Sequence, residues 1–377
     1  MKIAILTHNF PENQLERKNA GIFVFDLAKE LSKKNQVTVF TPGSKDTQKI
    51  VDSVKVHFFK WKGTSLGNLK LWNPSDVIKL LFFFINGEKN LNNFYQLNKP
   101  EKIIAMWAFP SGLFAYLLKK RFNISYTIWT LGSDIYIYAK KPFLSFLIKK
   151  ILENSTHLIA DSVDLKKETE KLANTKCYFI PSATKIDYSL KLKSKGSSKI
   201  IITFLGRVEK AKGADILIDS LHKLGPELVR FEINIIGDGK LLPILKSNSK
   251  KLINSKSVNF FGNLDDPKKI FSILSNSDWV IIPSRNDSIP LVFSEAMKVK
   301  TPVIVSDLAD FKYLINKYKV GLLFKSGDSN KLFELLKNLN KNNQRYLNFK
   351  QNTLTAAKAF SIEDSAKKLL AVIKNDK

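Results

Sequence analysis

The stretch WVIIPSRNDSIPLVFSEAM, residues 279–297, begins with a short apolar run, continues through a polar turn and ends in an amphipathic segment. Trp279–Ile282 has the length and composition of a buried strand. Pro290 is tolerated in the first turn of a helix, so we expect a helix that begins near Ser288. A strand that leads through a turn into a helix is the repeating unit of a parallel sheet covered by helices.

The same alternation extends in both directions along the chain. It predicts strands at Ile3–Leu6, Val37–Thr41, Val54–Phe59, Lys102–Trp107, Tyr126–Trp129, His157–Ala160, Tyr178–Ile180, Ile200–Leu205, Phe231–Ile236, Val258–Phe261, Trp279–Ile282, Pro302–Val305 and Gly321–Phe324. Helical patterns separate most of them. The sequence therefore predicts α/β structure with doubly wound parallel sheets.

A polar stretch, SLKLKSKGSS at residues 189–198, interrupts this alternation. Its Lys, Ser and Gly composition is typical of a linker. We therefore predict two Rossmann-like domains, residues 1–188 and 199–357, that face each other across a cleft and bind ligands at the carboxyl ends of their sheets. A final helix within residues 358–377 is expected to cross back to the first domain.

The composition is ordinary for a globular protein except for its charge. Lys and Arg total 61 against 34 Asp and Glu, a formal net charge of +27, and only six of the 61 are Arg. Such a field attracts anions, from phosphates to acidic lipid surfaces. An alternative is that the Lys and Phe enrichment reflects a genome rich in A and T codons. A nucleic-acid-binding protein is disfavoured because no binding motif accompanies the charge.

The sequence predicts a cytoplasmic location. Cys177 is the one cysteine and lies in an apolar run, where we expect a buried strand residue. His8, Asn9 and Pro11 end the N-terminal apolar run too early for a signal peptide. The apolar run at residues 80–85 is much shorter than the ~20 residues of a membrane-spanning helix.

Basic residues follow the first predicted strand of the second domain. Gly206 and Arg207 come directly after Ile200–Leu205, and Lys212 stands at the start of the next helical pattern. The planar guanidinium of Arg207 suits bidentate phosphate recognition, and Lys212 adds a compact second charge. Together they predict a diphosphate site. The alternative is a solvated surface pair.

Two carboxylates follow the strand Trp279–Ile282. Asp287 lies before the expected helix, and Glu295 lies within it between apolar neighbours. A half-buried carboxylate needs hydrogen-bond donors, which the hydroxyls of a ribose would supply. Alternatively, Asp287 is a helix N-cap and Glu295 an exposed helical residue.

The first domain offers weaker signals at its strand ends. Gly21 precedes a helix and would let backbone amides approach an anion, or it merely eases a turn. No G-x-G-x-x-G follows the first strand, which disfavours a dinucleotide-binding enzyme. Trp107 would stack on a sugar or belong to the core. Asp134 would position an acceptor hydroxyl or cap the following turn.

In this order, the motifs resemble the retaining glycosyltransferases of family 4, the group 1 transferases with the GT-B fold. The match covers nearly the whole chain. It is carried by Gly206-Arg207, Lys212-Gly213, Gly237-Asp238-Gly239, Gly262, Pro283-Ser284, Asp287 to Glu295-Ala296-Met297 and Thr301-Pro302-Val303-Ile304, and more loosely by Trp107-Ala108-Phe109-Pro110-Ser111-Gly112 and Gly132-Ser133-Asp134.

The resemblance implies a nucleotide-sugar donor, UDP-, GDP- or ADP-linked, held mainly by the second domain. Gly206, Arg207 and Lys212 would hold the diphosphate as the leaving group, with the amides near Gly21 and at Leu291 and Val292 assisting. Glu295 would bind the ribose, Asp287 would lie near the donor sugar, and Asn263 and Leu264 would line the base. Trp107 and Asp134 would serve the acceptor. No metal and no cofactor are expected.

The implied activity is metal-independent transfer of a sugar to a glycan or lipid-linked acceptor with retention of configuration, in polysaccharide or glycolipid synthesis. Asp replaces the usual Glu at position 287, and Leu131 stands where many relatives carry His. The alternatives are a nucleotide-sugar epimerase of the same fold and a non-catalytic relative that only binds the sugar nucleotide.

Two segments suggest contact with a membrane. Residues 140–152 (KKPFLSFLIKKIL) combine Lys and Phe as helices on anionic lipid do, and residues 77–85 (VIKLLFFFI) are a second candidate. The alternative is that both are ordinary helices packed on the sheet. We hypothesise peripheral attachment to the inner face of the membrane.

Overall fold

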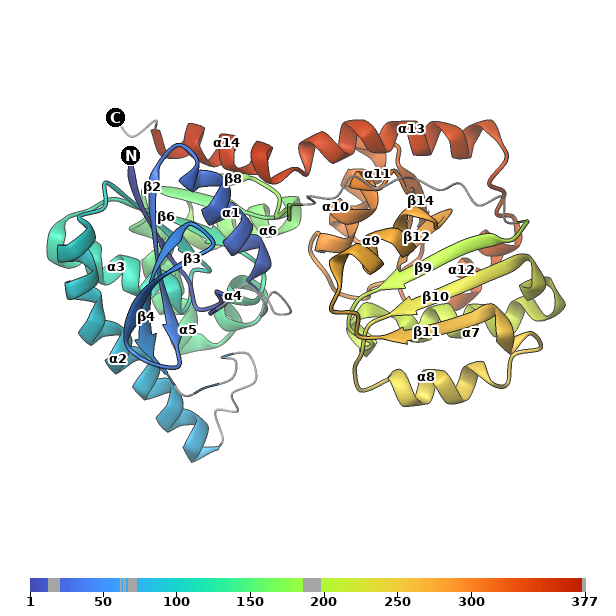
Figure 1. Cartoon of the computed structure of the whole chain (residues 1–377), viewed down its shortest axis with the longest axis horizontal. Helices are drawn as coiled ribbons and strands as arrows, with labels where there is room; N and C mark the ends of the chain where they lie inside the picture. The colour runs from blue at the N-terminus through green and yellow to red at the C-terminus, as the bar shows by residue number, and fades with distance from the viewer. Residues whose placement is uncertain (13–20, 62, 64–65, 67–72, 186–197, 375–377) are drawn as a thin grey trace. The chain divides into compact units, whose positions relative to one another are not determined.

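Buried apolar strands build two separate sheets in the computed structural model of the chain, in which residues 1–12, 21–61, 63, 66, 73–185 and 198–374 are described. The chain divides into two units (Figure 1). The first unit contains residues 1–184 and 362–377, and the second contains residues 185–361. The predicted linker, residues 189–198, lies outside the described residues except for Ser198.

The first unit has an eight-stranded sheet in the order β3-β4-β2-β1-β5-β6-β7-β8. Neighbouring strands are parallel except β3 and β4. The strands are β1 (Lys2–Leu6), β2 (Gln36–Gly43), β3 (Thr47–Val51), β4 (Val54–Lys60), β5 (Lys102–Met106), β6 (Tyr126–Thr130), β7 (His157–Ala160) and β8 (Cys177–Phe179). The helices are α1 (Ile22–Ser32), α2 (Pro74–Asn98), α3 (Ser111–Phe122), α4 (Ser133–Tyr136), α5 (Pro142–Glu153), α6 (Val163–Ala173) and α14 (Ile362–Lys374).

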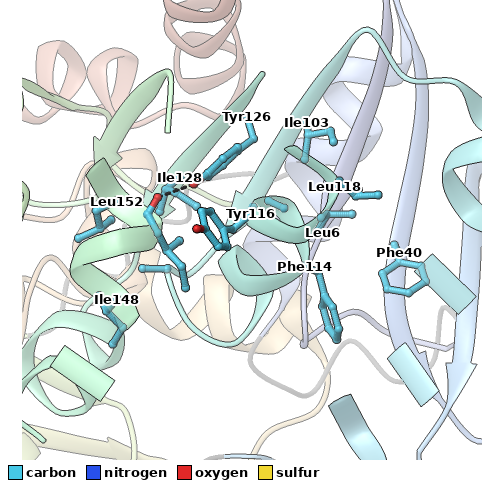
Figure 2. Close-up of a cluster of buried hydrophobic side chains, with 14 of the residues drawn as sticks. Leu6, Phe40, Ile103, Phe114, Tyr116, Leu118, Tyr126, Ile128, Ile148 and Leu152 are labelled. Carbon is cyan, nitrogen blue, oxygen red and sulfur yellow. Dashed lines mark hydrogen bonds between the residues drawn. The ribbon is translucent and has the colours of Figure 1, made fainter. Parts of the chain in front are cut away.

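Two apolar cores cover the faces of this sheet. One core joins the sheet to α2, α3, α5 and α6, and Figure 2 shows part of it, where the Tyr126 hydroxyl donates to the carbonyl of Ile151 at 2.5 Å. The other core joins the sheet to α1 and α14. In α14, Leu369 is fully buried, and the Ser365 hydroxyl donates to the carbonyl of Pro181 at 2.8 Å.

The second unit has a six-stranded parallel sheet in the order β11-β10-β9-β12-β13-β14. Its strands are β9 (Ile200–Leu205), β10 (Phe231–Ile236), β11 (Val258–Gly262), β12 (Trp279–Ile282), β13 (Val303–Ser306) and β14 (Gly321–Phe324). Its helices are α7 (Ala214–Leu224), α8 (Leu242–Ser249), α9 (Pro267–Ser275), α10 (Leu291–Lys298), α11 (Ala309–Tyr318), α12 (Ser329–Lys337) and α13 (Gln344–Ala359).

The predicted fold class, two doubly wound α/β domains with parallel sheets, is confirmed. Every predicted strand is present within a residue or two, and Cys177 is buried in β8 as expected. The strand β3 was not predicted. Its alternating exposure at the edge of the sheet gives it no continuous apolar run.

The helix after β12 starts later than predicted. It begins at Leu291, because Pro290 stands at the N-cap with an extended ψ of 149°. A residue before proline is disfavoured in the α region, which keeps Ile289 out of the helix as well. The turn between β12 and α10 is therefore longer than the sequence suggested.

Candidate functional site

The strand order of the second sheet reverses at β9. Its neighbour on one side is β10, which follows it in the chain, and on the other side it is β12. Ligands of doubly wound sheets bind outside the carboxyl ends of the strands at such a switch point. The segments that follow here are Gly206–Gly213 after β9 and Pro283–Pro290 after β12. They contain four of the predicted donor-site residues, Gly206, Arg207, Lys212 and Asp287.

These segments approach each other backbone to backbone. Gly213 has φ +73°, and a Cβ built on it would lie 1.9 Å from the carbonyl oxygen of Pro283. A Cβ on Gly237, at the end of β10, would lie 1.9 Å from the carbonyl oxygen of Gly206. Only glycine permits both the conformation of Gly213 and these contacts. The three strand ends are thus held together without intervening side chains.

Lys212 and Asp287 meet at this switch point. Lys212 Nζ lies 2.5 Å from Asp287 Oδ2, and the side chains are only 21% and 12% exposed. The Ser284 hydroxyl donates to the same carboxylate oxygen at 3.0 Å. The structure therefore brings together two residues that sequence analysis assigned to the donor diphosphate and the donor sugar.

Arg285, in the segment after β12, makes hydrogen bonds and an ion pair to residues that follow β9. Its guanidinium makes a bidentate ion pair with Asp215 of α7, at 2.8 and 2.7 Å. It also donates to the carbonyl of Lys210, and its backbone N–H donates to the carbonyl of Ala211. Asp215 raises the pKa of Arg285. This pair was not predicted from the sequence, although an Arg in a chain that has only six of them was a usable signal.

Arg207 projects from the end of β9. Its side chain is 69% exposed, and its contact is with Glu209, 3.1 Å from Nη1 to Oε2. An exposed ion pair of this kind holds its partner weakly. The guanidinium is therefore available to an anion.

Glu295 lies one turn into α10. It is half-buried, and the surrounding protein atoms raise the pKa of its carboxyl group to about 7, against the opposing effect of the Lys298 charge. No hydrogen bond to this carboxylate is found among the described residues. Leu291 and Val292 are the first two residues of α10, and no side chain caps this helix end within the described part of the chain. A half-buried acceptor and open amides are therefore available on one helix.

The predicted base-lining residues lie further along the sheet edge. Asn263 and Leu264 follow β11, which is separated from β9 by β10. Asn263 is exposed, and its side-chain amide donates to Asp265 at 3.1 Å. They share the carboxyl edge of the sheet with the other predicted residues of the second unit.

The first unit has its own switch point, between β1 and β5. His8 follows β1 and Trp107 follows β5, and their ring centroids lie 4.4 Å apart. Burial lowers the pKa of His8 to about 3, so this imidazole is neutral near pH 7. Trp107 is half-buried and has φ +69°, an unusual conformation for a bulky residue. Sequence analysis did not assign His8 a function, although its place directly after the first strand was visible.

Asp134 is completely buried in α4. Its carboxylate accepts hydrogen bonds from the backbone N–H groups of Ala108, Leu131, Gly132 and Ile135. Burial raises its pKa to about 6 in spite of these donors. This arrangement favours the turn-capping interpretation of Asp134. The carboxylate joins the turn after β6 to the turn after β5, which carries Trp107.

Gly21, also a predicted donor-site residue, is the N-cap of α1 with φ +136°. It belongs to the first unit, whereas the other predicted donor residues belong to the second.

No group of three or more His, Cys, Asp or Glu side chains among the described residues is placed to hold a metal ion. No helix in the described part of the chain is long and apolar enough to cross a membrane.

Comparison with known proteins gives one family and several relatives. Residues 189–355 match the family model described as glycosyl transferases group 1. An uncharacterized glycosyltransferase of Methanocaldococcus jannaschii is 24% identical over 288 residues, which are 74% of this chain and 77% of the relative. A putative teichuronic acid biosynthesis glycosyltransferase of Bacillus subtilis, TuaC, is 24% identical over 63% of this chain and 60% of its own length.

Among solved structures, HepE of Anabaena in complex with UDP is similar in fold. Its TM-score is 0.72 at 16% identity, with 99% of this chain and 100% of that chain covered. At this identity the likeness shows a shared fold and no more.

Proposed function

We propose that the chain, which has the GT-B fold and matches the group 1 glycosyltransferases over residues 189–355, transfers a sugar from a nucleotide-sugar donor with retention of configuration. The bond between the sugar C1 and the diphosphate oxygen breaks, a bond from C1 to an acceptor oxygen forms, the acceptor loses its proton, and the nucleoside diphosphate leaves. The observation that carries this proposal is the grouping of cations, open amides and an unpaired carboxylate at the β9–β12 switch point.

The diphosphate is proposed to bind between Arg207 and Lys212. Arg207 is exposed and only weakly held by Glu209, while Lys212 is mostly buried. Charge that develops on the leaving oxygen would be stabilised by these two cations and by the amides of Leu291 and Val292 at the start of α10. The site needs no metal for this role, because the positive charge is supplied by side chains and a helix end.

Asp287 is proposed to have two roles. It neutralises Lys212 before the donor binds, and it lies near the donor sugar afterwards. Its carboxylate neutralises the ammonium at 2.5 Å. A phosphate that takes over this ammonium would release Asp287 toward the sugar. The hydroxyl of Ser284 would remain as its hydrogen-bond donor.

We propose three further donor-site residues, Glu295, Asn263 and Leu264, all in the second unit. The half-buried carboxylate of Glu295 is suited to accept hydrogen bonds from the ribose. Asn263 and Leu264 would line the base. The UDP bound by HepE supports a nucleotide ligand for this fold.

The acceptor is proposed to bind at the β1–β5 switch point of the first unit. Trp107 offers a half-buried aromatic surface for a sugar, and His8 supports its ring. Asp134 would position this loop by holding the N–H of Ala108. A glycan or lipid-linked acceptor of surface-polysaccharide synthesis agrees with the pathway for which TuaC is named. The enzyme would work at the inner face of the membrane.

The test is thermal stabilisation by UDP-, GDP-, ADP- and CMP-sugars and by the free nucleotides. One nucleotide should raise the melting temperature of the parent protein, and Arg207→Ala and Glu295→Gln should each lose most of this shift. Arg345→Ala and Glu334→Gln, exposed residues of the same unit, serve as matched controls. The proposal is wrong if no nucleotide stabilises the parent protein or if the controls lose the shift equally.

Retention requires a second measurement. With the donor identified, proton NMR of the product should show the donor's anomeric configuration at the new bond. An isomerised free sugar in place of a glycoside would instead identify an epimerase.

A further inference from the structure

Two helices of the first unit expose large apolar side chains. Phe143 and Phe146 of α5 are 81% and 70% exposed. Ile78, Leu81, Phe82 and Ile85 of α2 are each more than half exposed. We call these six residues, with the lysines beside them, the α2–α5 surface. Contiguous exposed apolar surface of this kind marks an interaction site more often than chance exposure does.

The exposed residues are not part of the faces that pack on the sheet. In α2, the exposed positions follow the i, i+3, i+4, i+7 spacing of one helical face. The buried positions Phe83, Gly87, Leu91 and Phe94 lie on another face. In α5, Ile148, Ile151 and Leu152 are buried, opposite Phe143 and Phe146. Packing within the unit therefore buries one apolar face of each helix. The second apolar face of each helix has no packing partner within the described part of the unit.

Both exposed faces lie on helices that cover the same side of the sheet and contribute to one core. The helix between them, α3, has no exposed side chain before Lys120. Ring contacts bridge the gap, since Phe84 of α2 lies 5.5 Å from Phe109, which lies 6.0 Å from Tyr138, close to the start of α5. Half-buried aromatic side chains therefore lie between the two exposed faces.

Lysines border the apolar side chains. Lys140, Lys141, Lys149 and Lys150 are all exposed around Phe143 and Phe146, and the acidic residue on α5 is Glu153. Lys79 of α2 is paired with Asp76 of the same helix, and Arg121 of α3 is paired with Glu88 of α2. The excess positive charge therefore gathers at the α5 end. Exposed Phe set among Lys is the chemistry of helices that lie in an anionic lipid interface.

The position of this surface fits the acceptor site. The helices after β4, β5 and β6 start at the carboxyl edge of the sheet, so Ile78–Ile85 and Phe143–Phe146 lie in the helix halves nearest that edge. Trp107 and Phe109 belong to the same edge. A bilayer against this surface would lie beside the proposed acceptor residues.

We propose that the α2–α5 surface docks on an anionic phospholipid bilayer. This inference rests on the proposed function, because it names the membrane at which that function takes place. Phe143, Phe146 and the exposed side chains of α2 enter the headgroup region, and the four lysines contact the anionic lipid headgroups.

The test is sedimentation of the full chain with vesicles of phosphatidylcholine containing phosphatidylglycerol, and with vesicles of phosphatidylcholine alone. We expect binding to the anionic vesicles that weakens with salt. The double variants Phe143→Ser/Phe146→Ser and Lys140→Glu/Lys150→Glu should each lower the partition coefficient about tenfold or more. The controls are Ile253→Ser, which removes an apolar side chain 74% exposed in the second unit, and Lys367→Glu/Lys374→Glu on α14.

Several results would overturn the proposal: equal binding to both vesicle types, no binding at low salt, or the same loss in the controls. A concentration-dependent dimer that the Phe143→Ser/Phe146→Ser variant abolishes would assign the surface to a second copy instead. Stabilisation by nucleotides is measured on the same variants. If nucleotides stabilise the parent protein but the parent protein does not bind vesicles, the proposed donor site is supported and only the proposed membrane surface is rejected.

Discussion

At Asp134, a single buried carboxylate satisfies four backbone donors of two turns. Removing it would leave those N–H groups buried without an acceptor, at about 1–3 kcal/mol for each unsatisfied group. We predict that Asp134→Ala lowers the free energy of unfolding of the first unit by about 3–5 kcal/mol, measured by chemical denaturation.

Asp328→Ala is the comparison for that variant. Asp328 also accepts two backbone N–H groups, at the N-terminus of α12, but solvent can replace it there. We expect Asp328→Ala to lower the free energy of unfolding by about 1 kcal/mol. If Asp134→Ala and Asp328→Ala lower the free energy of unfolding equally, burial of Asp134 does not account for its contribution to stability.

Glu295 gives a prediction for pH. Its pKa is raised from 4.5 to about 7, so ionisation of this carboxyl group opposes folding. The stability it contributes is fully present below pH 4.5 and is lost as the pH rises through about 7. The side chain of Glu295→Gln cannot ionise. We therefore expect the melting temperature of this variant to fall less than that of the parent protein as the pH rises from 5 to 8. Parallel curves for the two proteins would contradict the prediction.

At the scale of elements, the packing of the β9 and β12 segments depends on Gly213. We predict that Gly213→Ala destabilises the second unit by at least about 2 kcal/mol more than Gly262→Ala, because it adds a steric clash to the same backbone strain. Gly262 has φ +64° with no atom within 4 Å of a built Cβ, so it isolates the strain alone. Denaturant unfolding of both variants measures the difference, and similar losses would show that the close approach is tolerated.

The elements also show what the sequence could reveal. Strands such as β9 and β12 are buried on both faces, and their continuous apolar runs are visible without a structure. The edge strand β3 has no such run. Gly206, Arg207, Lys212 and Asp287 could be placed at a strand end because each lies next to a predictable strand.

Contacts between distant residues could not be predicted in the same way. The ion pair of Arg285 with Asp215 joins positions 70 residues apart, and the ring contact of His8 with Trp107 joins two different strand ends. Nothing in the local sequence of either partner indicates the other. The start of α10 also escaped prediction, since Pro290 suits the N-cap and the first helical turn alike.

At the scale of the whole molecule, α14 completes a core that is otherwise built from residues far earlier in the chain. Ile362, Leu369 and Ile373 are buried against the core that contains α1. We predict that Leu369→Ala lowers the free energy of unfolding of the first unit by about 2–5 kcal/mol. Hydrogen exchange should show weaker protection in α1. Leu347→Ala, at a residue 50% exposed in α13, should have little effect, and loss of protection confined to the second unit would contradict the prediction.

The placement of α14 also has a consequence for biosynthesis. A ribosome makes the residues of α1 early and those of α14 only after all of Lys185–Ser361. At about 5–20 residues per second, about 15 to 70 seconds pass between the synthesis of α1 and that of the helix that covers its apolar side. During translation the nascent first unit is therefore a candidate for chaperone binding, and the second unit, whose segments are contiguous, is able to mature before it.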